Sequence, residues 1–160
     1  MISETPEHVV ADTSCLIILS KIERLEILRD LYGELMIPME VKKEFGKHLP
    51  SWIHAVDPSG NSIDQFSSAG LGRGEEAAFA LASELQNTLL IIDDLDARRY
   101  ADRLQIRHTG TLGVILKAKE RGIIQHVRPL VVAIQTTDFR IGRELMHFVL
   151  QQANEESESL

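Results

Sequence analysis

Short apolar runs bounded by turn residues alternate with stretches of helical periodicity along most of the chain. Four such runs are expected to be strands: His8–Ala11, Leu35–Ile37, Thr88–Ile92 and Ile106–Thr109. Ile53–Val56 is a possible fifth. Continuous apolar runs of this length are typical of strands that are covered on both faces. Their alternation with helices predicts an α/β protein with a mainly parallel sheet.

The segments between these runs have the 3.6-residue spacing of apolar positions that helices need. The stretch that follows Asp12 is expected to form two short helices or one bent helix, since the apolar pattern breaks near Lys21. The other expected helices are Met39–Phe45, Glu75–Leu85, Asp96–Leu104, Thr111–Arg121, about Pro129–Gln135, and Gly142–Gln152. Residues 47–73 lose periodicity, and a loop of that length is typical of a binding segment or a lid.

Length and composition indicate one domain that needs no disulfide bond or structural metal ion for stability. The chain has 160 residues, of which 44% are hydrophobic and 26% charged, and we expect a single domain over 1–152 followed by a disordered acidic tail over 153–160. The single cysteine, Cys15, gives no intrachain disulfide framework and favours a reducing cytoplasm. No export signal and no membrane span are expected, because the apolar runs are far too short.

The net charge of −7 is unevenly distributed along the sequence. Residues 1–97 hold 7 Lys and Arg against 17 Asp and Glu, whereas residues 98–143 hold 10 against 3. Such segregation is compatible with a basic face for phosphates beside an acidic pocket, and equally with solvated helix faces.

Acidic residues follow two of the expected strands. Asp12 follows the first strand, and the pair Asp93 and Asp94 follows the apolar run that begins at Thr88. In open α/β sheets ligands bind beyond the carboxyl ends of the strands, so these carboxylates are expected to share a crevice suited to a divalent cation.

Further acids are candidates for the same crevice: Glu44, near the end of its helix, and Glu75 or Glu76, at the start of the next one. Each single acid also has a structural alternative. Asp12 is a possible helix cap, Glu75 is a possible complement to a helix dipole, and Glu44 is a possible partner for Lys47. Adjacent Asp93 and Asp94 favour a functional interpretation, because neighbouring like charges need a compensating cation or basic group. Asp96 adds a third acid nearby.

Other chemistries are disfavoured. The six histidines lack the spacing of zinc ligands, and no phosphate-binding loop or serine nucleophile motif is present. Cys15 lies among large apolar residues and is expected to be packed in the core.

Five segments together resemble the PIN-domain family. They are VVADTSCLIILSKI, MIPMEVKKEF, LGRGEEAAFALA, LLIIDDLDARRYADRL and RHTGTLGVILKAKERGII, in the family's order and spacing. The resemblance spans nearly the whole chain and is closest to a compact prokaryotic branch described as nucleic-acid-binding. It implies a three-layer α/β/α fold with a central, mainly parallel sheet of four or five strands.

The resemblance also implies a function: a Mg²⁺- or Mn²⁺-dependent ribonuclease that hydrolyses phosphodiester bonds, with many members acting as the toxin of a toxin–antitoxin pair. Its catalytic acids fall on Asp12, Glu44, Glu75 and Asp94, of which Asp12, Glu44 and Asp94 are the expected metal ligands. Supporting roles fall on Ser14, Asp93, Asp96 and Thr111, and RNA phosphates are expected to contact Arg98, Arg99 and Lys117. The structural alternative is that Arg98 or Arg99 pairs with Asp94 or Asp102. The implied partners are RNA, an antitoxin protein and a second copy of the chain.

Two departures from the family pattern leave a second function open. Position 75 is Glu where the toxins usually have Asp, and the helix that starts at Thr111 begins without an acid. The alternative is therefore a catalytically silent PIN-like module that binds RNA or a protein partner. Metal-dependent cleavage would separate these two functions.

Overall fold

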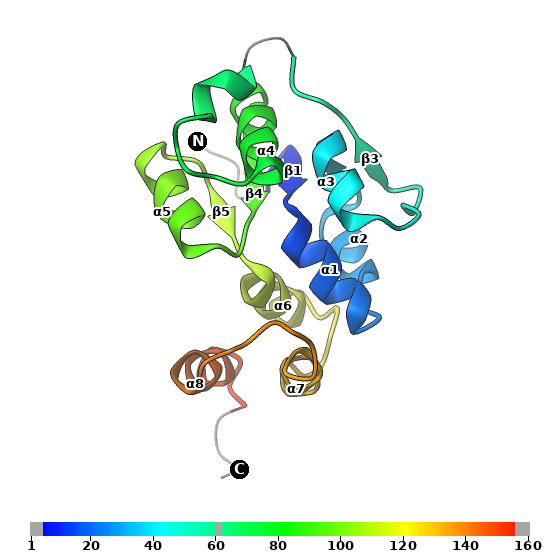
Figure 1. Cartoon of the computed structure of the whole chain (residues 1–160). Coiled ribbons are helices and arrows are strands. Elements are labelled where there is room, and N and C mark those ends of the chain that lie inside the picture. The colour runs from blue at the N-terminus through cyan, green and yellow to red at the C-terminus, as the bar shows by residue number, and fades with distance from the viewer. Residues whose placement is uncertain (1–4, 60–61, 156–160) are drawn as a thin grey trace.

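The computed structural model describes residues 5–59 and 62–155, and it contains one sheet of five parallel strands in the order β3-β2-β1-β4-β5 (Figure 1). The strands are β1 (His8–Ala11), β2 (Leu35–Ile37), β3 (Ile53–Ala55), β4 (Thr88–Ile91) and β5 (His108–Thr109). β1 lies at the centre, with β2 on one side and β4 on the other. The prediction of an α/β fold with four or five mainly parallel strands is confirmed.

The helices also follow the predicted order. They are α1 (Thr13–Lys21), α2 (Glu26–Tyr32), α3 (Met39–Phe45), α4 (Arg73–Glu84), α5 (Leu95–Arg103), α6 (Thr111–Glu120), α7 (Arg128–Ile134) and α8 (Arg143–Gln152), with a 3-10 turn, η1, at Ser62–Phe66. The predicted break after the first strand produces two helices. Glu23 lies between them with a φ of 57°, a left-handed conformation that stops α1 and redirects the chain.

The last strand is shorter than predicted. Ile106 was expected to begin it, but the backbone N–H of Ile106 donates to the carbonyl of Ala101 and so closes the end of α5. Ladder pairing with β4 therefore starts only at His108.

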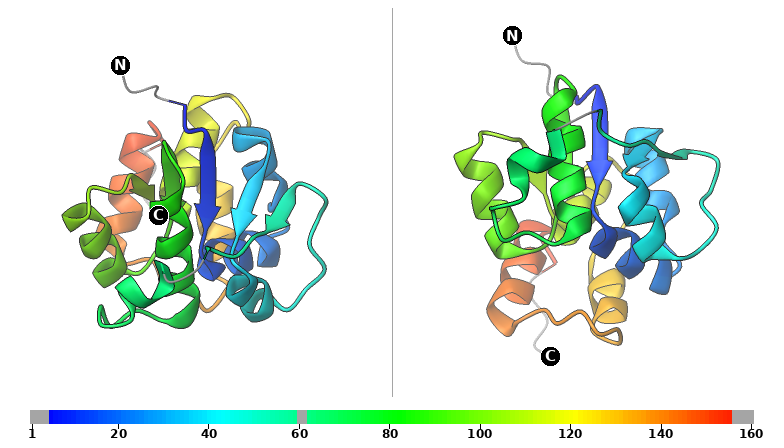
Figure 2. Two further views of the ribbon diagram at one scale, coloured as in Figure 1. Left: turned by 90° about the horizontal axis from the view of Figure 1, so that it is seen from above. Right: turned by 45° about the horizontal axis from the view of Figure 1, so that its top comes forward.

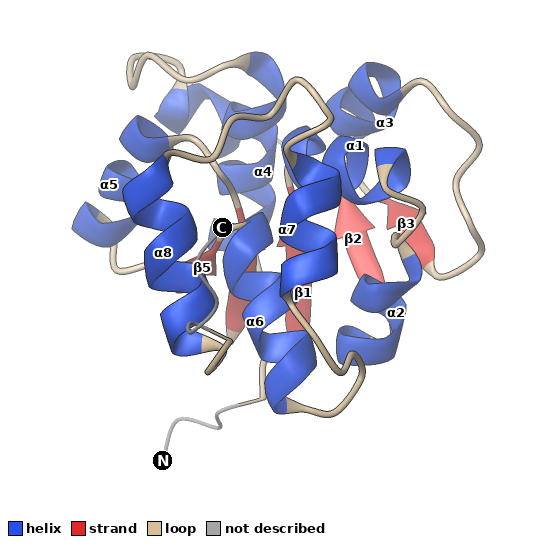
Figure 3. Cartoon of the chain, turned by 90° about the horizontal axis from the view of Figure 1, so that it is seen from below, coloured by secondary structure: helices blue, strands red, loops and turns tan. Residues whose placement is uncertain are grey.

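Side chains of alternate residues on the strands enter two separate cores, as the period of two in a strand requires. Val9 and Ala11 face the core that α1, α2, α6, α7 and α8 cover. Val10 and Leu90 face the opposite core, formed with α4 and α5. Figures 2 and 3 show the resulting layers, with α6, α7 and α8 together on one side of the sheet. This is the predicted three-layer arrangement.

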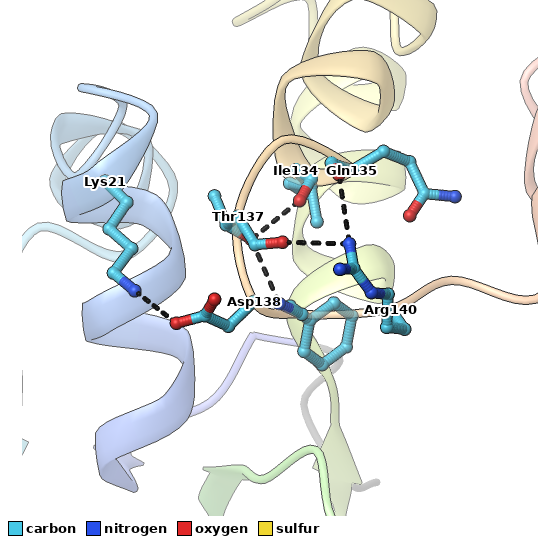
Figure 4. Close-up of polar contacts among 7 residues, drawn as sticks. Lys21, Ile134, Gln135, Thr137, Asp138 and Arg140 are labelled. Atoms are coloured by element: carbon cyan, nitrogen blue, oxygen red, sulfur yellow. Dashed lines mark hydrogen bonds and ion pairs between the residues drawn. The ribbon is translucent and has the colours of Figure 1, made fainter.

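The loop between α7 and α8 contacts α1 (Figure 4). Lys21 at the end of α1 makes an ion pair with Asp138, with 3.4 Å between Nζ and Oδ2. Arg140 closes the loop by donating to the backbone carbonyls of Gln135 and Thr137 at 3.4 and 3.3 Å. The Lys21–Asp138 ion pair thus links this loop to the end of α1.

The chain end has more contacts than the predicted disordered tail implies. Of residues 153–160 the structure describes 153–155, and Ala153 is 4% exposed. The carboxylate of Glu155 accepts hydrogen bonds from the backbone N–H groups of Val127 and Arg128 and forms an ion pair with Lys119. Glu155 therefore fixes the start of α7, while residues 156–160 lie outside the described part of the chain.

Candidate functional site

The strand order reverses between β1 and β4, and this is where the predicted acids lie. From β1 the chain builds β2 and β3 on one side of the sheet, then crosses to β4 and β5 on the other. Asp12 follows β1, and its backbone N–H donates to the carbonyl of Ile91 at the end of β4, at 3.0 Å. Parallel α/β sheets bind ligands at such a reversal, because the following loops and helices separate there and leave a crevice.

Asp12 is a buried carboxylate in an acidic environment. Its exposed fraction is 8%, and burial raises its pKa from 3.8 to about 7. The backbone N–H of Thr13 acts in the opposite direction, whereas the nearby charges of Glu75, Glu44 and Asp93 raise the pKa further. Asp12 precedes α1, and apart from its contact with the backbone N–H of Thr13, the first residue of that helix, its side chain makes no capping hydrogen bond. The structural alternative for Asp12, a helix cap, is therefore supported only by the Thr13 contact.

Glu44 is held against two other elements. Its Oε2 accepts a hydrogen bond from the hydroxyl of Thr13, at 2.5 Å, which links α3 to the residue after Asp12. The same carboxylate lies against the backbone of α4, where a Cβ added at Gly74 would be only 2.8 Å from Oε2. The alternative partner, Lys47, donates to Ser20 instead. Glu44 thus faces the crevice between the starts of α1 and α4.

Glu75 and Asp94 each use one oxygen to cap a helix start. Oε1 of Glu75 accepts from the backbone N–H of Gly72 at 3.0 Å, and Oδ2 of Asp94 accepts from that of Ala97 at 2.9 Å. Burial raises the pKa of Glu75 despite the Gly72 contact, and the charges of Asp94 and Glu44 add to this effect. Glu75 therefore has the structural role predicted as its alternative, at the start of α4, and it also belongs to the acidic group.

The supporting residues divide between buried and exposed positions. Asp93 binds Thr111, which is fully buried at the start of α6, through two hydrogen bonds of 2.8 and 2.6 Å. Asp96 is exposed and pairs with Arg99 at 3.5 Å. Ser14 is exposed on α1.

A cavity of about 780 Å³ adjoins the acidic group. Glu75, Asp94 and Asp96 line it together with Arg99 and Arg103, so carboxylates and guanidinium groups line the same cavity. This combination suits a phosphodiester, because cations can hold the backbone phosphates beside an acidic centre.

The three basic residues predicted to contact RNA do not lie together. Arg99 lines the cavity beside the acids. Arg98 has its Nε 3.5 Å from Nδ1 of His108, and Lys117 on α6 lines a different cavity. The basic residues of the segment 98–143 thus lie in separate parts of the molecule.

Sequence reasoning missed Arg103, Gly74 and Thr13. Arg103 lies four residues after Arg99 on α5, so helical spacing was a signal that places both on one face. The contacts of Gly74 and Thr13 with Glu44 join distant parts of the sequence, and no local pattern indicates them.

Both chemistry and proximity decide whether the acidic residues fit a cation. Within residues 5–59 and 62–155, no group of three or more His, Cys, Asp or Glu is close enough to hold an ion. The donors are nevertheless all carboxylates, and Mg²⁺ is usually held by one or two of these together with waters and substrate phosphates. The mutual repulsion that raises the pKa of Asp12 is what a cation would offset. The donor set therefore fits a hard divalent cation.

The fold and the acidic crevice define a nuclease-type α/β protein. A family model described as a PIN domain matches residues 8–155, so the chain belongs to the PIN-domain family. PIN domains are generally nucleases that use divalent metal ions and bind nucleic acid. A search of curated proteins gave no match. In the described residues, no helix combines the length and apolar character that crossing a bilayer requires.

Proposed function

We propose that the protein is a ribonuclease that hydrolyses RNA phosphodiester bonds with the help of Mg²⁺ or Mn²⁺. The observation that carries the proposal is the buried carboxylate of Asp12, which interacts electrostatically with Glu44 and Glu75 at the strand-order reversal. A buried carboxylate among like charges is costly for stability, and such an arrangement is typical of a functional site.

In this proposal one or two of the carboxylates of Asp12, Glu44 and Asp94 hold the cation, and water and substrate phosphate supply its other ligands. The cation would supply Lewis-acid stabilisation of the negative charge on the scissile phosphate. Thr13 and the backbone at Gly74 orient the Glu44 carboxylate, because they fix it from two sides. Asp93 is not a cation ligand in this proposal, because both of its carboxylate oxygens accept hydrogen bonds from Thr111.

Glu75 is the proposed acceptor of the proton from the attacking water. Its carboxylate lines the cavity, and one of its oxygens is fixed by Gly72. Arg99 and Arg103 on α5 hold the RNA backbone in that cavity. Asp96 has no direct part in this contact, since its ion pair with Arg99 is exposed and such pairs contribute little.

The decisive experiment is cleavage of unstructured and structured RNA by the purified protein with Mg²⁺, Mn²⁺ or EDTA. Asp94→Asn is the test variant, because Asn is an equally good helix cap and α5 should remain stable. Asp64→Asn, the same change at an exposed position in η1, is the matched control. Metal-dependent cleavage that Asp94→Asn abolishes and Asp64→Asn retains is the expected result. Equal cleavage by all three proteins would indicate a contaminating nuclease.

One pair of contacts favours the second candidate, a silent PIN-like module that binds RNA or a protein. Glu75 and Asp94 both cap helices, so these acids have a structural use that does not depend on catalysis. If the wild type binds RNA but cleaves nothing with any metal, this candidate replaces the nuclease.

A toxin role, an antitoxin partner and a homodimer are further parts of the proposal that rest on the family resemblance. A neighbouring gene for a small antitoxin, and a complex of its product with this chain that blocks cleavage, would support the toxin role. Light scattering on the purified chain would test the dimer.

A further inference from the structure

A second cavity, of about 300 Å³, lies beside β4 and β5 on the face of the sheet that α6 covers, and none of the predicted catalytic acids lines it. Residues of β4, β5, α2 and α6 contribute to its lining, among them Leu89, Thr109, Tyr32 and Lys117. Leu89 is the second residue of β4, whereas Asp93 and Asp94 follow that strand. Thr109 is the last residue of β5, so the cavity extends along that short strand.

The lining of this cavity is cationic. Arg107, Lys117 and Arg121 all contribute, and no Asp or Glu is among the described residues that line it. Lys117 also pairs with Glu120, at 3.5 Å, but both side chains are largely exposed and such pairs contribute little. In a chain with a net charge of −7, a cavity whose lining includes three cations favours an anionic ligand.

Tyr32 supplies a neutral hydroxyl beside the cations. Burial raises the pKa of Tyr32 to about 12, while the positive charges of Arg107 and Arg121 act in the opposite direction. The phenol thus stays protonated at neutral pH and is able to donate a hydrogen bond to an anion that the guanidinium groups attract.

The rest of the lining is partly apolar. Leu31 and Leu89 line the same cavity as the Tyr32 side chain, so the cavity offers charge and also a surface for a flat or apolar group. A volume of about 300 Å³ is at the lower end for ligand sites and fits a small molecule better than a polymer.

We propose that this cavity binds a small organic phosphate of about the size of a nucleoside monophosphate. The phosphate lies against Arg107, Lys117 and Arg121, and the organic part lies against Leu31, Leu89 and the Tyr32 ring. Two negative charges match three cations better than a single carboxylate does, and Arg in particular binds phosphate through two parallel hydrogen bonds. This site is independent of the proposed ribonuclease function.

Calorimetric titration of the full chain with adenosine 5′-monophosphate tests the proposal. The titrations contain EDTA, so that no metal can recruit the nucleotide to the acidic crevice. Wild type, Arg121→Gln and Lys117→Gln are compared with Arg24→Gln, the same type of change at an exposed position between α1 and α2, and with Asp94→Asn. We expect Arg121→Gln and Lys117→Gln each to weaken binding by about tenfold or more, because each removes a charge-assisted contact. Arg24→Gln and Asp94→Asn should bind as the wild type does.

Three outcomes would overturn the proposal. The first is that adenosine 5′-monophosphate does not bind to the wild type at millimolar concentration. The second is that binding is equally strong in Arg121→Gln and Lys117→Gln. The third is that inorganic phosphate binds as tightly as the nucleotide, since the apolar part of the lining would then have no use. If an RNA oligonucleotide binds and loses affinity in Arg121→Gln while the mononucleotide does not bind, the cavity is part of an RNA surface instead.

Discussion

Both carboxylate oxygens of Asp93 are bound to Thr111: Oδ1 accepts from its backbone N–H at 2.8 Å, and Oδ2 accepts from its hydroxyl at 2.6 Å. The contact joins the loop after β4 to the start of α6, across residues that are 18 apart in the sequence. Gly110 leaves room for it, because a Cβ at that position would lie 2.9 Å from Oδ1. Asp93 therefore fixes the edge of the sheet from which Asp94 projects.

Thr111→Val is expected to lower the free energy of unfolding by about 1–3 kcal/mol, since it removes a hydrogen bond to a charged group at a fully buried position and leaves the shape nearly unchanged. Urea denaturation measures the loss. Thr136→Val is the control, because the Thr136 hydroxyl donates only to a backbone carbonyl at the surface. Equal losses in the two variants would contradict the role given to Asp93.

Gly74→Ala is expected to impair the acidic site without destabilising the fold. The added methyl group would lie 2.8 Å from Oε2 of Glu44 and must displace that carboxylate, whereas Ala is a better helix former than Gly by about 1 kcal/mol. Metal-dependent RNA cleavage should therefore fall by about tenfold or more while the melting temperature stays level or rises.

Gly142→Ala is the matched control for this experiment. Gly142 precedes α8, and a Cβ added there meets nothing within 4 Å. If Gly74→Ala and Gly142→Ala cleave RNA equally well, Glu44 does not need its present position for catalysis.

Much of the fold could be predicted because its strands are buried on both faces. A strand such as β1 must then be apolar at consecutive positions, and the run His8–Ala11 has the same bounds in the structure as in the prediction. The polar residue that ends such a run marks the carboxyl edge of a parallel sheet, which is how Asp12 and Asp94 were found.

The contacts that organise the site were not predictable in the same way. Glu44 meets Gly74 and Thr13 only because α3, α4 and α1 pack together, and no spacing along the chain encodes those approaches. The separation of the basic residues of the segment 98–143 also results from how the helices pack. Arg99 and Lys117 lie close in sequence, but α5 and α6 cover opposite faces of the sheet.

Arg99→Gln and Arg103→Gln are each expected to weaken RNA binding and to lower the dependence of log K on log salt concentration by about 1, because each removes one phosphate contact. Lys117→Gln is the internal control, since Lys117 lines the other cavity. Binding in EDTA at several salt concentrations, followed by fluorescence anisotropy, measures both quantities. An unchanged salt dependence in Arg99→Gln and Arg103→Gln would remove α5 from the RNA surface.

Asp12→Asn is expected to stabilise the metal-free protein, and increasingly so as the pH rises. The pKa of Asp12 is about 7 in the folded state and 3.8 as the reference for the unfolded chain. The unfolded state therefore loses its proton first, and the wild type becomes less stable between about pH 4 and pH 7, whereas Asn carries no charge at any pH.

The difference in the free energy of unfolding between Asp12→Asn and wild type should accordingly grow by about 3 kcal/mol from pH 5 to pH 8, at about 1.4 kcal/mol for each pH unit below the folded pKa. Urea denaturation in EDTA at both pH values measures it. Other titrating groups are common to both proteins and largely cancel in the difference. A difference that stays constant with pH would mean that Asp12 is already ionised without cost, and the acidic crevice would then need no cation to offset its repulsion. If the difference in the free energy of unfolding grows with pH in EDTA and disappears when Mn²⁺ replaces EDTA, the cation binds at Asp12 and offsets the repulsion there.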